Sequence, residues 1–522
     1  MLKRVVSGWE MQKLDSIVIK EIGIPAEVLM ERAGVGVSEK LSEMFPPADF
    51  PGVLIVCGPG NNGGDGMVCA RHLKSKGYQI KVVILCDEDR YKGEAKLNLE
   101  IIKKLKIIPR RIKDSSEMSE LLESEKPEII VDAIFGTGLK RKVEGFFAEI
   151  INLINRYKEE KKGKVVSVDI PSGVCSNTGR ILGTAVKADL TVSFELPKIG
   201  HIFYPGKEFT GKLELVPISF PAEVIEKNAP ARYYIDLAWA KSVFKRRKGY
   251  VHKGNFGHVL VLAGSRGKSG AGYLAGLGAL RGGAGLVTLA STRTLQKIYA
   301  SMLPEALTLG LEENFYGEVS LKDLPKIIEA SHKKTAFVIG PGLGLSSEMK
   351  NLFFEILSCI NIPLVIDADA LTLLSEKPEI LQNYSGVKIL TPHPGEAIRL
   401  LKISKNELLE DRLYWTKKLA ELTGAVVILK GAHSIICSKD QEGISSIDEP
   451  GLSQGGTGDV LAGLIGALIS QGYDAFTSAC LGVFIHGTAG KLLSEEYGPF
   501  GYPASLVAET FPRVFKILQE ES

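Results

Sequence analysis

Short apolar segments alternate with helical segments along most of this chain. Residues 53–57 (VLIVC), 80–86 (IKVVILC) and 128–134 (EIIVDAI) are continuous apolar runs, whereas residues 65–77 and 93–105 have helical spacing. Continuous apolar strands that are separated by helices are typical of a parallel sheet buried on both faces. The alternation therefore predicts an α/β fold in which helices cover both faces of a parallel sheet.

The alternation is interrupted between residues 217 and 236. This stretch contains Pro217, Pro221 and Pro230 and has little periodicity, and the alternation resumes at residue 258. A chain of 522 residues is also too long for one ordinary domain. We therefore expect two α/β domains, residues 1–216 and residues 217–522, and because their glycine motifs differ we do not expect one to repeat the other.

Charge and cysteine use limit the classes of partner. The net charge of +3 is small and predicts no strong affinity for nucleic acid. No apolar run is long enough to span a bilayer, and the first residues lack the apolar centre of a signal peptide. The seven cysteines form no C-x-x-C pair, which is typical of reduced thiols. We expect a soluble cytoplasmic protein without nucleic-acid or membrane partners.

Three predicted strands of the first domain are followed by polar, glycine-containing loops, residues 58–66 (GPGNNGGDG), 135–142 (FGTGLKRK) and 171–173 (PSG). Ligands of parallel α/β sheets bind at the carboxyl ends of the strands. If the three strands are neighbours, their loops converge on one crevice. The alternative is that these residues only form turns, in which glycine, asparagine, aspartate and proline are common.

The first of these loops resembles a dinucleotide fingerprint. Gly58, Gly60 and Gly63 follow the spacing that lets a backbone approach a pyrophosphate at a helix N-terminus. Asp65 argues against this interpretation, because its carboxylate would repel a diphosphate. The phosphates would then lie on residues 136–142, where two glycines expose the backbone and three basic side chains supply charge.

Oxygen-bearing side chains in the same loops suggest a cation. Asn61, Asn62 and Asp65 offer amide and carboxylate oxygens. Asp132 lies near the tip of the second strand, and Ser172 lies in the turn after the third. Oxygen ligands of this kind suit a hard cation.

The second domain contains the strongest motif of the chain, residues 453–463 (SQGGTGDVLAG). A glycine-rich turn that opens a helix can bind a transferring phosphoryl group with its backbone amides. Asp459 follows in the first turn, where it can accept a proton from a substrate hydroxyl. The alternative is a helix start with an acid near its positive end.

The first domain resembles the NAD(P)H-hydrate epimerase family. The resemblance rests on GIPAEVLMERAG (23–34), GPGNNGGDG, VDAIFGTGL (131–139) and VDIPSG (168–173), and covers essentially the whole domain. It implies a Rossmann-like three-layer fold, a catalytic, substrate-contacting acid at Asp169, and a potassium ion bound by Asn62, Asp132 and Ser172. The residues implied to contact the hydrated dinucleotide are Asn61, Asn62, Gly63, Gly64, Asp65, Gly136, Thr137, Gly138, Leu139, Lys140, Arg141, Lys142 and Asp169.

The second domain resembles the ribokinase-like superfamily and, within it, the ADP/ATP-dependent NAD(P)H-hydrate dehydratases. The motifs are GSRGKSGAGYLAG (264–276), GPGLG (340–344), LTPHPGEAIRL (390–400), LKGAHS (429–434) and GGTGDVLAG (455–463). The resemblance implies ADP or ATP as co-substrate and a magnesium ion. The residues implied to contact the hydrate are Ala271, Gly342, His393 and the catalytic Asp459. Those implied to hold the nucleotide are Lys430, Gly431, Ala432, His433, Ser434 and Gly458.

With an epimerase-like domain followed by a dehydratase-like domain, the whole chain resembles the bifunctional NAD(P)H-hydrate repair enzymes. We expect the chain to form a homo-oligomer. Its implied substrates, NADHX and NADPHX, carry water across the nicotinamide C5–C6 bond. The epimerase would interconvert the R and S hydrates. The dehydratase would act on the S form, with Asp459 deprotonating the C6 hydroxyl, the nucleotide phosphorylating it, and elimination restoring the dihydropyridine.

Two alternatives remain at this point. A ribokinase-like kinase of a vitamin precursor would share Asp459 and the anion hole but would release a stable phosphorylated product. The first domain could instead be a protein- or RNA-binding scaffold, although its Asn62, Asp132, Asp169 and Ser172 argue against that interpretation.

Overall fold

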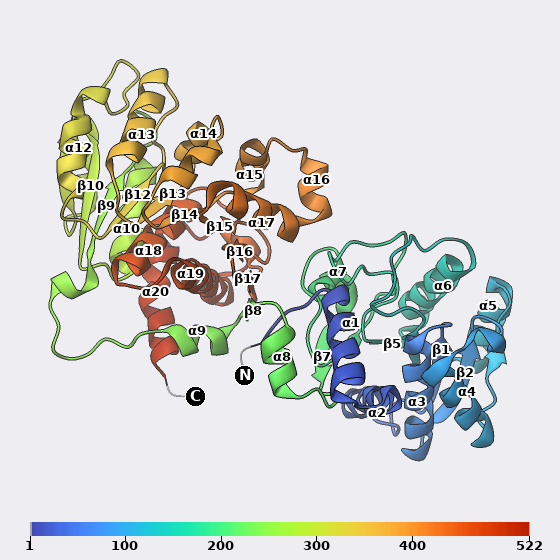
Figure 1. The fold of residues 1–522 in the computed structure, drawn as a ribbon. Helices are drawn as coiled ribbons and strands as arrows, with labels where there is room; N and C mark the ends of the chain where they lie inside the picture. Colours follow the sequence, from blue (N-terminus) through green and yellow to red (C-terminus); the bar gives the residue numbers. More distant parts are fainter. Residues whose placement is uncertain (1–2, 521–522) are drawn as a thin grey trace. The chain divides into compact units, whose positions relative to one another are not determined.

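The computed structural model describes residues 3–520, which form two compact units (Figure 1). Among the described residues, the amino-terminal unit is residues 4–230, and the carboxyl-terminal unit is residues 231–520, which Lys3 joins. The boundary thus differs from the expected position at residues 216 and 217. Val224, Ile225 and Ala229 are buried in the core of the amino-terminal unit, so the proline-containing stretch belongs largely to that unit.

The expected irregular connection contains two regular elements. Helix α8 (Ala222–Asn228) begins after Pro221, and strand β8 (Arg232–Ile235) follows Pro230 and pairs with the sheet of the carboxyl-terminal unit. Both elements are too short to produce a recognisable periodicity, which is why the sequence suggested a connection here.

The amino-terminal unit is built on a seven-stranded sheet in the order β3-β2-β1-β4-β5-β6-β7, and all its neighbouring strands are parallel. This confirms the predicted parallel sheet. The order reverses between β1 and β4, and such a switch point opens a crevice at the carboxyl ends of the strands. The strands are β1 (Gly52–Cys57), β2 (Gln79–Ile84), β3 (Arg110–Arg111), β4 (Ile129–Ala133), β5 (Lys164–Val168), β6 (Leu190–Phe194) and β7 (Lys212–Val216).

Helices cover both faces of this sheet and give the predicted three layers. One core lies under α1 (Gly8–Ile17), α2 (Ala26–Met44), α3 (Asn61–Ser75), α4 (Gly93–Lys104) and α8. The second core lies under α5 (Ser115–Glu125) and α6 (Gly145–Lys161) on the opposite face. The short helix α7 (Gly206–Thr210) precedes the last strand.

The carboxyl-terminal unit has a ten-stranded sheet in the order β11-β10-β9-β12-β13-β14-β15-β16-β17-β8. Its strands are parallel except that β16 is antiparallel to both β15 and β17. These two antiparallel pairs were not predicted from the sequence. The strands are β9 (His258–Leu262), β10 (Leu286–Thr292), β11 (Leu307–Leu311), β12 (Ala336–Ile339), β13 (Leu364–Ile366), β14 (Lys388–Leu390), β15 (Val426–Leu429), β16 (Ile435–Cys437) and β17 (Glu442–Ser445).

Glycines allow the helices on one face of this sheet to approach closely. A Cβ atom on Gly278 of α10 would lie 2.3 Å from the Val460 carbonyl oxygen, and one on Gly463 of α18 would lie 1.9 Å from that of Ala275. The helices that share this core are α9 (Leu237–Val243), α10 (Ser269–Arg281), α11 (Arg293–Met302), α18 (Thr457–Ser470), α19 (Ala475–Tyr497) and α20 (Ala504–Gln519).

Figure 1 shows the remaining helices of this unit on the other side of the sheet. They are α12 (Leu324–Ser331), α13 (Ser347–Cys359), α14 (Asp369–Leu374), α15 (Pro394–Leu401), α16 (Lys405–Glu410) and α17 (Arg412–Thr423). The structure therefore confirms the α/β class and the covered parallel sheet that were expected for both halves.

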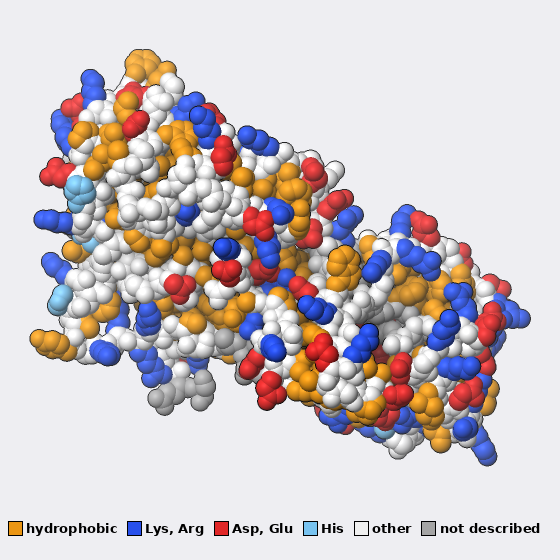
Figure 2. Space-filling view, viewed as in Figure 1, with side chains coloured by type: hydrophobic (Ala, Val, Ile, Leu, Met, Phe, Trp, Pro, Cys, Tyr) orange, Lys and Arg blue, Asp and Glu red, His pale blue; other side chains and the backbone are white. Residues whose placement is uncertain are grey.

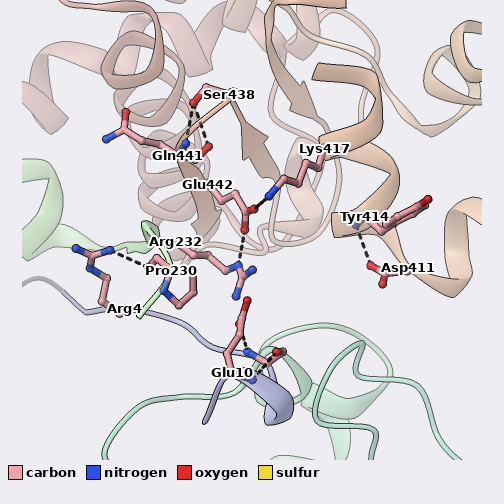
Figure 3. Close-up of polar contacts among 11 residues, drawn as sticks. Arg4, Glu10, Pro230, Arg232, Asp411, Tyr414, Lys417, Ser438, Gln441 and Glu442 are labelled. Atoms are coloured by element: carbon pink, nitrogen blue, oxygen red, sulfur yellow. Dashed lines mark hydrogen bonds and ion pairs between the residues drawn. The ribbon is translucent and has the colours of Figure 1, made fainter. Parts of the chain in front are cut away.

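Polar contacts secure the first strand of the carboxyl-terminal unit (Figure 3). Arg232 of β8 donates to the Glu442 carboxylate of β17 at 2.7 Å, and Lys417 of α17 donates to the same carboxylate at 3.0 Å. Within the amino-terminal unit, Arg4 Nη1 donates to the Pro230 carbonyl at 2.7 Å, so the first and last residues of that unit lie together.

Acidic and basic side chains are interspersed on the visible face of each unit (Figure 2). This distribution agrees with the small net charge and gives the visible face no single-sign patch of the size typical of a nucleic-acid interface. Among the residues that the structure describes, every helix is too short or too polar to cross a membrane.

Candidate active sites

A cavity of about 670 Å³ opens at the switch point of the amino-terminal sheet. Its walls come from α1, α2, the start of α3, and the loop that follows β4. The predicted residues that line it are Asn61, Asn62, Asp65, Gly136, Thr137, Gly138, Leu139, Lys140, Arg141 and Asp169. Gly63, Gly64, Asp132, Lys142 and Ser172 were predicted with them but are not among the lining residues. The loops after β1 and β4 thus line one cavity as expected, whereas the segment after β5 contributes Asp169 and not the predicted residues 171–173.

The glycines of the first loop are required by close packing. A Cβ on Gly58 would lie 2.0 Å from the Ile134 carbonyl oxygen, and one on Gly63 would lie 2.2 Å from that of Gly58. Gly64 leaves room for Met30, whose sulfur would be 2.7 Å from such an atom. These glycines bring the start of α3 against the loop after β4, so that Asn62 lies beside Gly136.

Asp132 and Ser172 form a buried network beneath the cavity. The Asp132 carboxylate accepts hydrogen bonds from Ser167 Oγ at 2.8 Å and from the Ser172 amide and hydroxyl at 2.9 and 2.5 Å. Burial raises the pKa of Asp132, and these hydrogen bonds oppose the effect. Among residues 3–520, Asn62 is one of the few whose buried side chain has a nitrogen without a hydrogen-bond partner, its Nδ2.

Asp169 reaches the cavity from the turn after β5, in a left-handed backbone conformation with φ of 64°. Its carboxylate accepts hydrogen bonds from Lys198 Nζ at 2.7 Å and Ser193 Oγ at 3.0 Å. Burial alone would raise the pKa of Asp169. The adjacent Lys198 ammonium, together with the hydrogen bonds from Lys198 and Ser193, outweighs burial and holds the pKa below its ordinary value.

Sequence reasoning missed several residues of this site. Lys198, Ser193 and His201 surround Asp169, and Asp15 of α1 lines the cavity. Burial raises the pKa of Asp15 to about 6, and Asp169 adds to that rise while Lys198 opposes it. The one available signal was a lysine in the apolar segment FELPKIGHIF, because a buried lysine needs a partner.

In the carboxyl-terminal unit, Asp459 lies in the first turn of α18, where the sequence placed it. Gly458 lies beside a buried ion pair, since a Cβ there would be 3.3 Å from Lys430 Nζ. Lys430 donates to Asp367 Oδ1 at 2.8 Å. Burial, with the negative charge of Asp367, raises the pKa of Asp459 to about 7, although Lys430 opposes the rise.

The predicted hydrate contacts also come from the carboxyl ends of the strands. Gly342, with φ of 59°, follows β12 and approaches Ala271 of α10 so closely that a Cβ would lie 3.0 Å from the Ala271 methyl. His393 caps α15 by accepting a hydrogen bond from the Gly395 amide at 3.0 Å, and burial lowers its pKa. Glu396, which sequence reasoning missed, is buried beside it, and burial raises its pKa to about 7.

The predicted nucleotide residues fall into two groups. Gly431 and Ala432 are exposed in the turn between β15 and β16, and Ser434 donates to the Gly431 carbonyl at 3.0 Å. Lys430 is directed to Asp367, and His433 is fully buried with its Nδ1 2.8 Å from the Ser445 carbonyl oxygen. The side chain of His433 is therefore not available to a ligand at this turn.

Two acids of the segment IDADA were also missed. Asp367 directly follows β13 and pairs with Lys430, and Asp369 starts α14 and accepts from Lys268 Nζ at 2.8 Å. Two carboxylates at the end of a buried strand were the signal that could have identified them.

Known proteins resemble both units. The family model described as YjeF-related protein N-terminus matches residues 26–200, and the model described as NAD(P)H-hydrate dehydratase matches residues 259–513. The bifunctional NAD(P)H-hydrate repair enzyme Nnr of Moorella thermoacetica is 38% identical over 99% of this chain and 97% of its own. The enzyme of the same name from Thermofilum pendens is 36% identical over 98% and 96%.

A solved structure also resembles part of the chain. It is the ADP/ATP-dependent NAD(P)H-hydrate dehydratase from Bacillus subtilis, co-crystallised with ATP/Mg²⁺. It is 28% identical, covers 56% of this chain and 100% of its own, and has a TM-score of 0.48.

Proposed function

The chain belongs to the bifunctional NAD(P)H-hydrate repair enzymes, and from this premise we propose which residues perform each reaction. The protein repairs hydrated NADH and NADPH, with an epimerase half and a dehydratase half. The amino-terminal unit epimerises the R and S hydrates, and the carboxyl-terminal unit dehydrates the S form with ADP or ATP as phosphoryl donor.

In the dehydratase half, Asp459 is the general base. It takes the proton of the C6 hydroxyl, and the oxygen attacks the terminal phosphorus of the nucleotide while the P–O bond to the rest of the nucleotide breaks. Phosphate then leaves C6 with the bonding electrons, and loss of a proton from C5 restores the C5–C6 double bond of the dihydropyridine. The observation that carries this assignment is the position of Asp459 in the first turn of α18, beside the Lys430–Asp367 pair, with a pKa of about 7. A base poised near neutrality is effective in proton transfer.

The nucleotide lies at the start of α18 and along the turn after β15. Gly458 and the backbone of residues 431–434 contact it, and the amides at the helix start neutralise the transferring phosphoryl group. Ala271, Gly342 and His393 contact the hydrate.

A magnesium ion fits the acids around Lys430. Within residues 3–520 no three histidine, cysteine or acidic side chains gather closely enough to enclose a metal by themselves. Asp367 and Glu396 nevertheless offer carboxylate oxygens, and magnesium commonly takes its remaining ligands from phosphates and water. Bound there with the nucleotide, magnesium would neutralise phosphate charge during transfer.

In the epimerase half, Asp169 contacts the hydrate, and the dinucleotide occupies the cavity along residues 61–65 and 136–142. Asn62, Asp132 and Ser172 hold a potassium ion. The mixture of neutral oxygens, from Asn62 Oδ1 and Ser172 Oγ, with the charged Asp132 carboxylate supports a monovalent ion. Hydrate affinity that is unchanged when a bulky organic cation replaces potassium would contradict this assignment.

Replacement of Asp459 by asparagine tests the dehydratase assignment. The amide keeps the size of the side chain but cannot accept the proton, so we expect kcat to fall on the order of 10²–10⁴-fold. Nucleotide Kd should change little, because the turn after β15 is intact. The measurement is absorbance of the restored dihydronicotinamide from (S)-NADHX, and near-normal turnover would exclude Asp459 as the base.

The cytoplasmic location and the homo-oligomeric state, which light scattering can test, remain predictions.

A further inference from the structure

Three acidic side chains and one buried lysine meet at the epimerase cavity. Asp15 comes from α1, Asp65 from the first turns of α3, and Asp169 from the turn after β5, and all three line the cavity. The Lys198 side chain is 1% exposed and lies behind Asp169. The other charged residues on the walls are Glu94, Lys140 and Arg141.

Lys198 is fixed by three acceptors, one for each of its ammonium protons. It donates to Asp169 Oδ1 at 2.7 Å, to Ser193 Oγ at 2.9 Å and to the Phe194 carbonyl at 2.9 Å. An ammonium that is buried and fully hydrogen-bonded has no proton left for a substrate. Its role must therefore act through the groups that it touches.

His201 holds the backbone of the same acid. Its Nδ1 accepts the Lys198 amide at 3.0 Å, so its Nε2 carries the proton and donates to the Asp169 carbonyl at 2.8 Å. Burial, together with the Lys198 charge, lowers the pKa of His201 to about 4, which keeps the ring neutral. The left-handed turn at Asp169 is thereby secured from two sides.

One ammonium can neutralise only one of the three carboxylates. Asp169 is the acid in contact with it, whereas Asp65 and Asp15 make no such pair in the described part of the chain. Burial and the charge of Asp169 raise the pKa of both of these acids, to about 6 for Asp15 and well above its ordinary value for Asp65, although the Lys198 charge opposes both rises. When the pKa values of carboxyl groups in one site are driven apart in this way, one group can act as a base and another as an acid.

We propose that Lys198 is a positioning residue that keeps Asp169 ionised and directed into the cavity, and that Asp15 is the general acid of epimerisation. This inference rests on the epimerase function proposed above and adds residues to it.

The proposed epimerisation is an acid-catalysed exchange of water at C6. Asp15 gives its proton to the C6 hydroxyl, the C6–O bond breaks, and water leaves with the bonding electrons. The lone pair of the ring nitrogen forms a C6–N double bond, and the Asp169 carboxylate balances the positive charge. Water then adds to the opposite face of C6 and returns a proton to Asp15.

The test uses the full chain with (R)-NADHX and no nucleotide, so that dehydration does not consume the product. The variants are Lys198→Met, Lys198→Arg and Asp15→Asn, and chromatography of the two epimers gives kcat and KM from pH 3 to pH 9. Lys158→Met removes a lysine that is paired with Asp189 elsewhere in the same unit, and Asp49→Asn changes an exposed acid, so both serve as matched controls.

Lys198→Met should move the acidic limb of kcat/KM upwards by at least about one pH unit, because Asp169 then loses its ammonium partner. Lys198→Arg keeps a positive charge beside Asp169, so its acidic limb should lie close to that of the wild type. In the wild type, kcat/KM should decline as pH rises above the pKa of Asp15, and Asp15→Asn should abolish that decline and lower the rate about 10²–10⁴-fold.

An unshifted acidic limb in Lys198→Met, or a wild-type rate in Asp15→Asn, would overturn the inference. If Lys198→Met fails to fold, Ser193→Ala should give a smaller shift in the same direction, and an unchanged limb in Ser193→Ala would overturn the positioning role. A wild-type chain that does not interconvert the epimers would instead remove the proposed epimerase function. ADP-dependent dehydration of (S)-NADHX by every variant reports the amount of active protein.

Discussion

Asp459 combines burial with a catalytic task, and its titration should be visible in the reaction. Its pKa of about 7 means that the ionised, proton-accepting form predominates only above that pH. We expect kcat/KM for dehydration of (S)-NADHX to rise between about pH 6 and pH 8. Absorbance assays across that range give the profile, and a flat one would show that another group accepts the proton.

The same residue should carry a cost in stability. The pKa of a free aspartate is 3.8, so the folded protein favours the protonated form of Asp459. Below about pH 4 both the folded and unfolded chains are protonated and there is no penalty, and the penalty grows until the pH passes 7. Asp459→Asn should therefore raise the free energy of unfolding of this unit at pH 8 by on the order of 1–3 kcal/mol and leave it unchanged at pH 4.

Thermal melts of wild type and Asp459→Asn at the two pH values measure this difference. The comparison has an internal control, because the transition of the amino-terminal unit should not move. If Asp459→Asn is less stable than the wild type at pH 8, then the favourable interactions of the ionised Asp459 carboxylate exceed the free-energy cost of burying it.

Individual residues differ in how far the sequence could predict them. Asp169 and Asp459 stand in short motifs at a strand end and a helix start, so their position in a site followed from local pattern. Asp15 occupies an ordinary helical segment, and Lys198 follows a proline in a loop. Only the fold brings these two residues to the cavity, because the segments that carry them are more than 100 residues apart.

At the scale of elements, the approach of α10 to α18 depends on glycine. A Cβ on Gly463 would lie 1.9 Å from the Ala275 carbonyl oxygen, so Gly463→Ala must push the two helices apart. We expect a loss of about 1–3 kcal/mol in the free energy of unfolding. A Cβ on Gly270, which belongs to α10, meets no heavy atom within 4 Å, so Gly270→Ala should be close to neutral. Denaturant titrations compare the two variants.

The elements that the sequence failed to predict are the short ones. Parallel strands such as β1 and β9 form continuous apolar runs, which the buried sheet requires. Strands β16 and β17 have three and four residues and alternate with turns, and β8 begins two residues after Pro230. Their pairing at the sheet edge is decided by tertiary contacts such as Arg232 to Glu442 rather than by local pattern.

At the scale of the whole molecule, each unit has its own core and its own set of acids, so the two activities should be separable. Asp169→Ala should abolish epimerisation and leave dehydration of (S)-NADHX nearly intact, whereas Asp459→Asn should do the reverse. The double variant should show the product of the two effects, as independent sites do. Loss of both activities in Asp169→Ala, with normal thermal melts, would contradict this division.

The hydrogen bond between Arg4 and the Pro230 carbonyl holds the two ends of the amino-terminal unit together, which bears on how genes for such units fuse during evolution. A compact unit whose two ends meet can be joined to another protein, or removed from it, without threading through either core. A gene that encodes this unit could accordingly fuse with, or separate from, the gene of its neighbour in one step. Selection would then act on whether two repair reactions are produced in equal amounts, a property that fusion fixes at one to one.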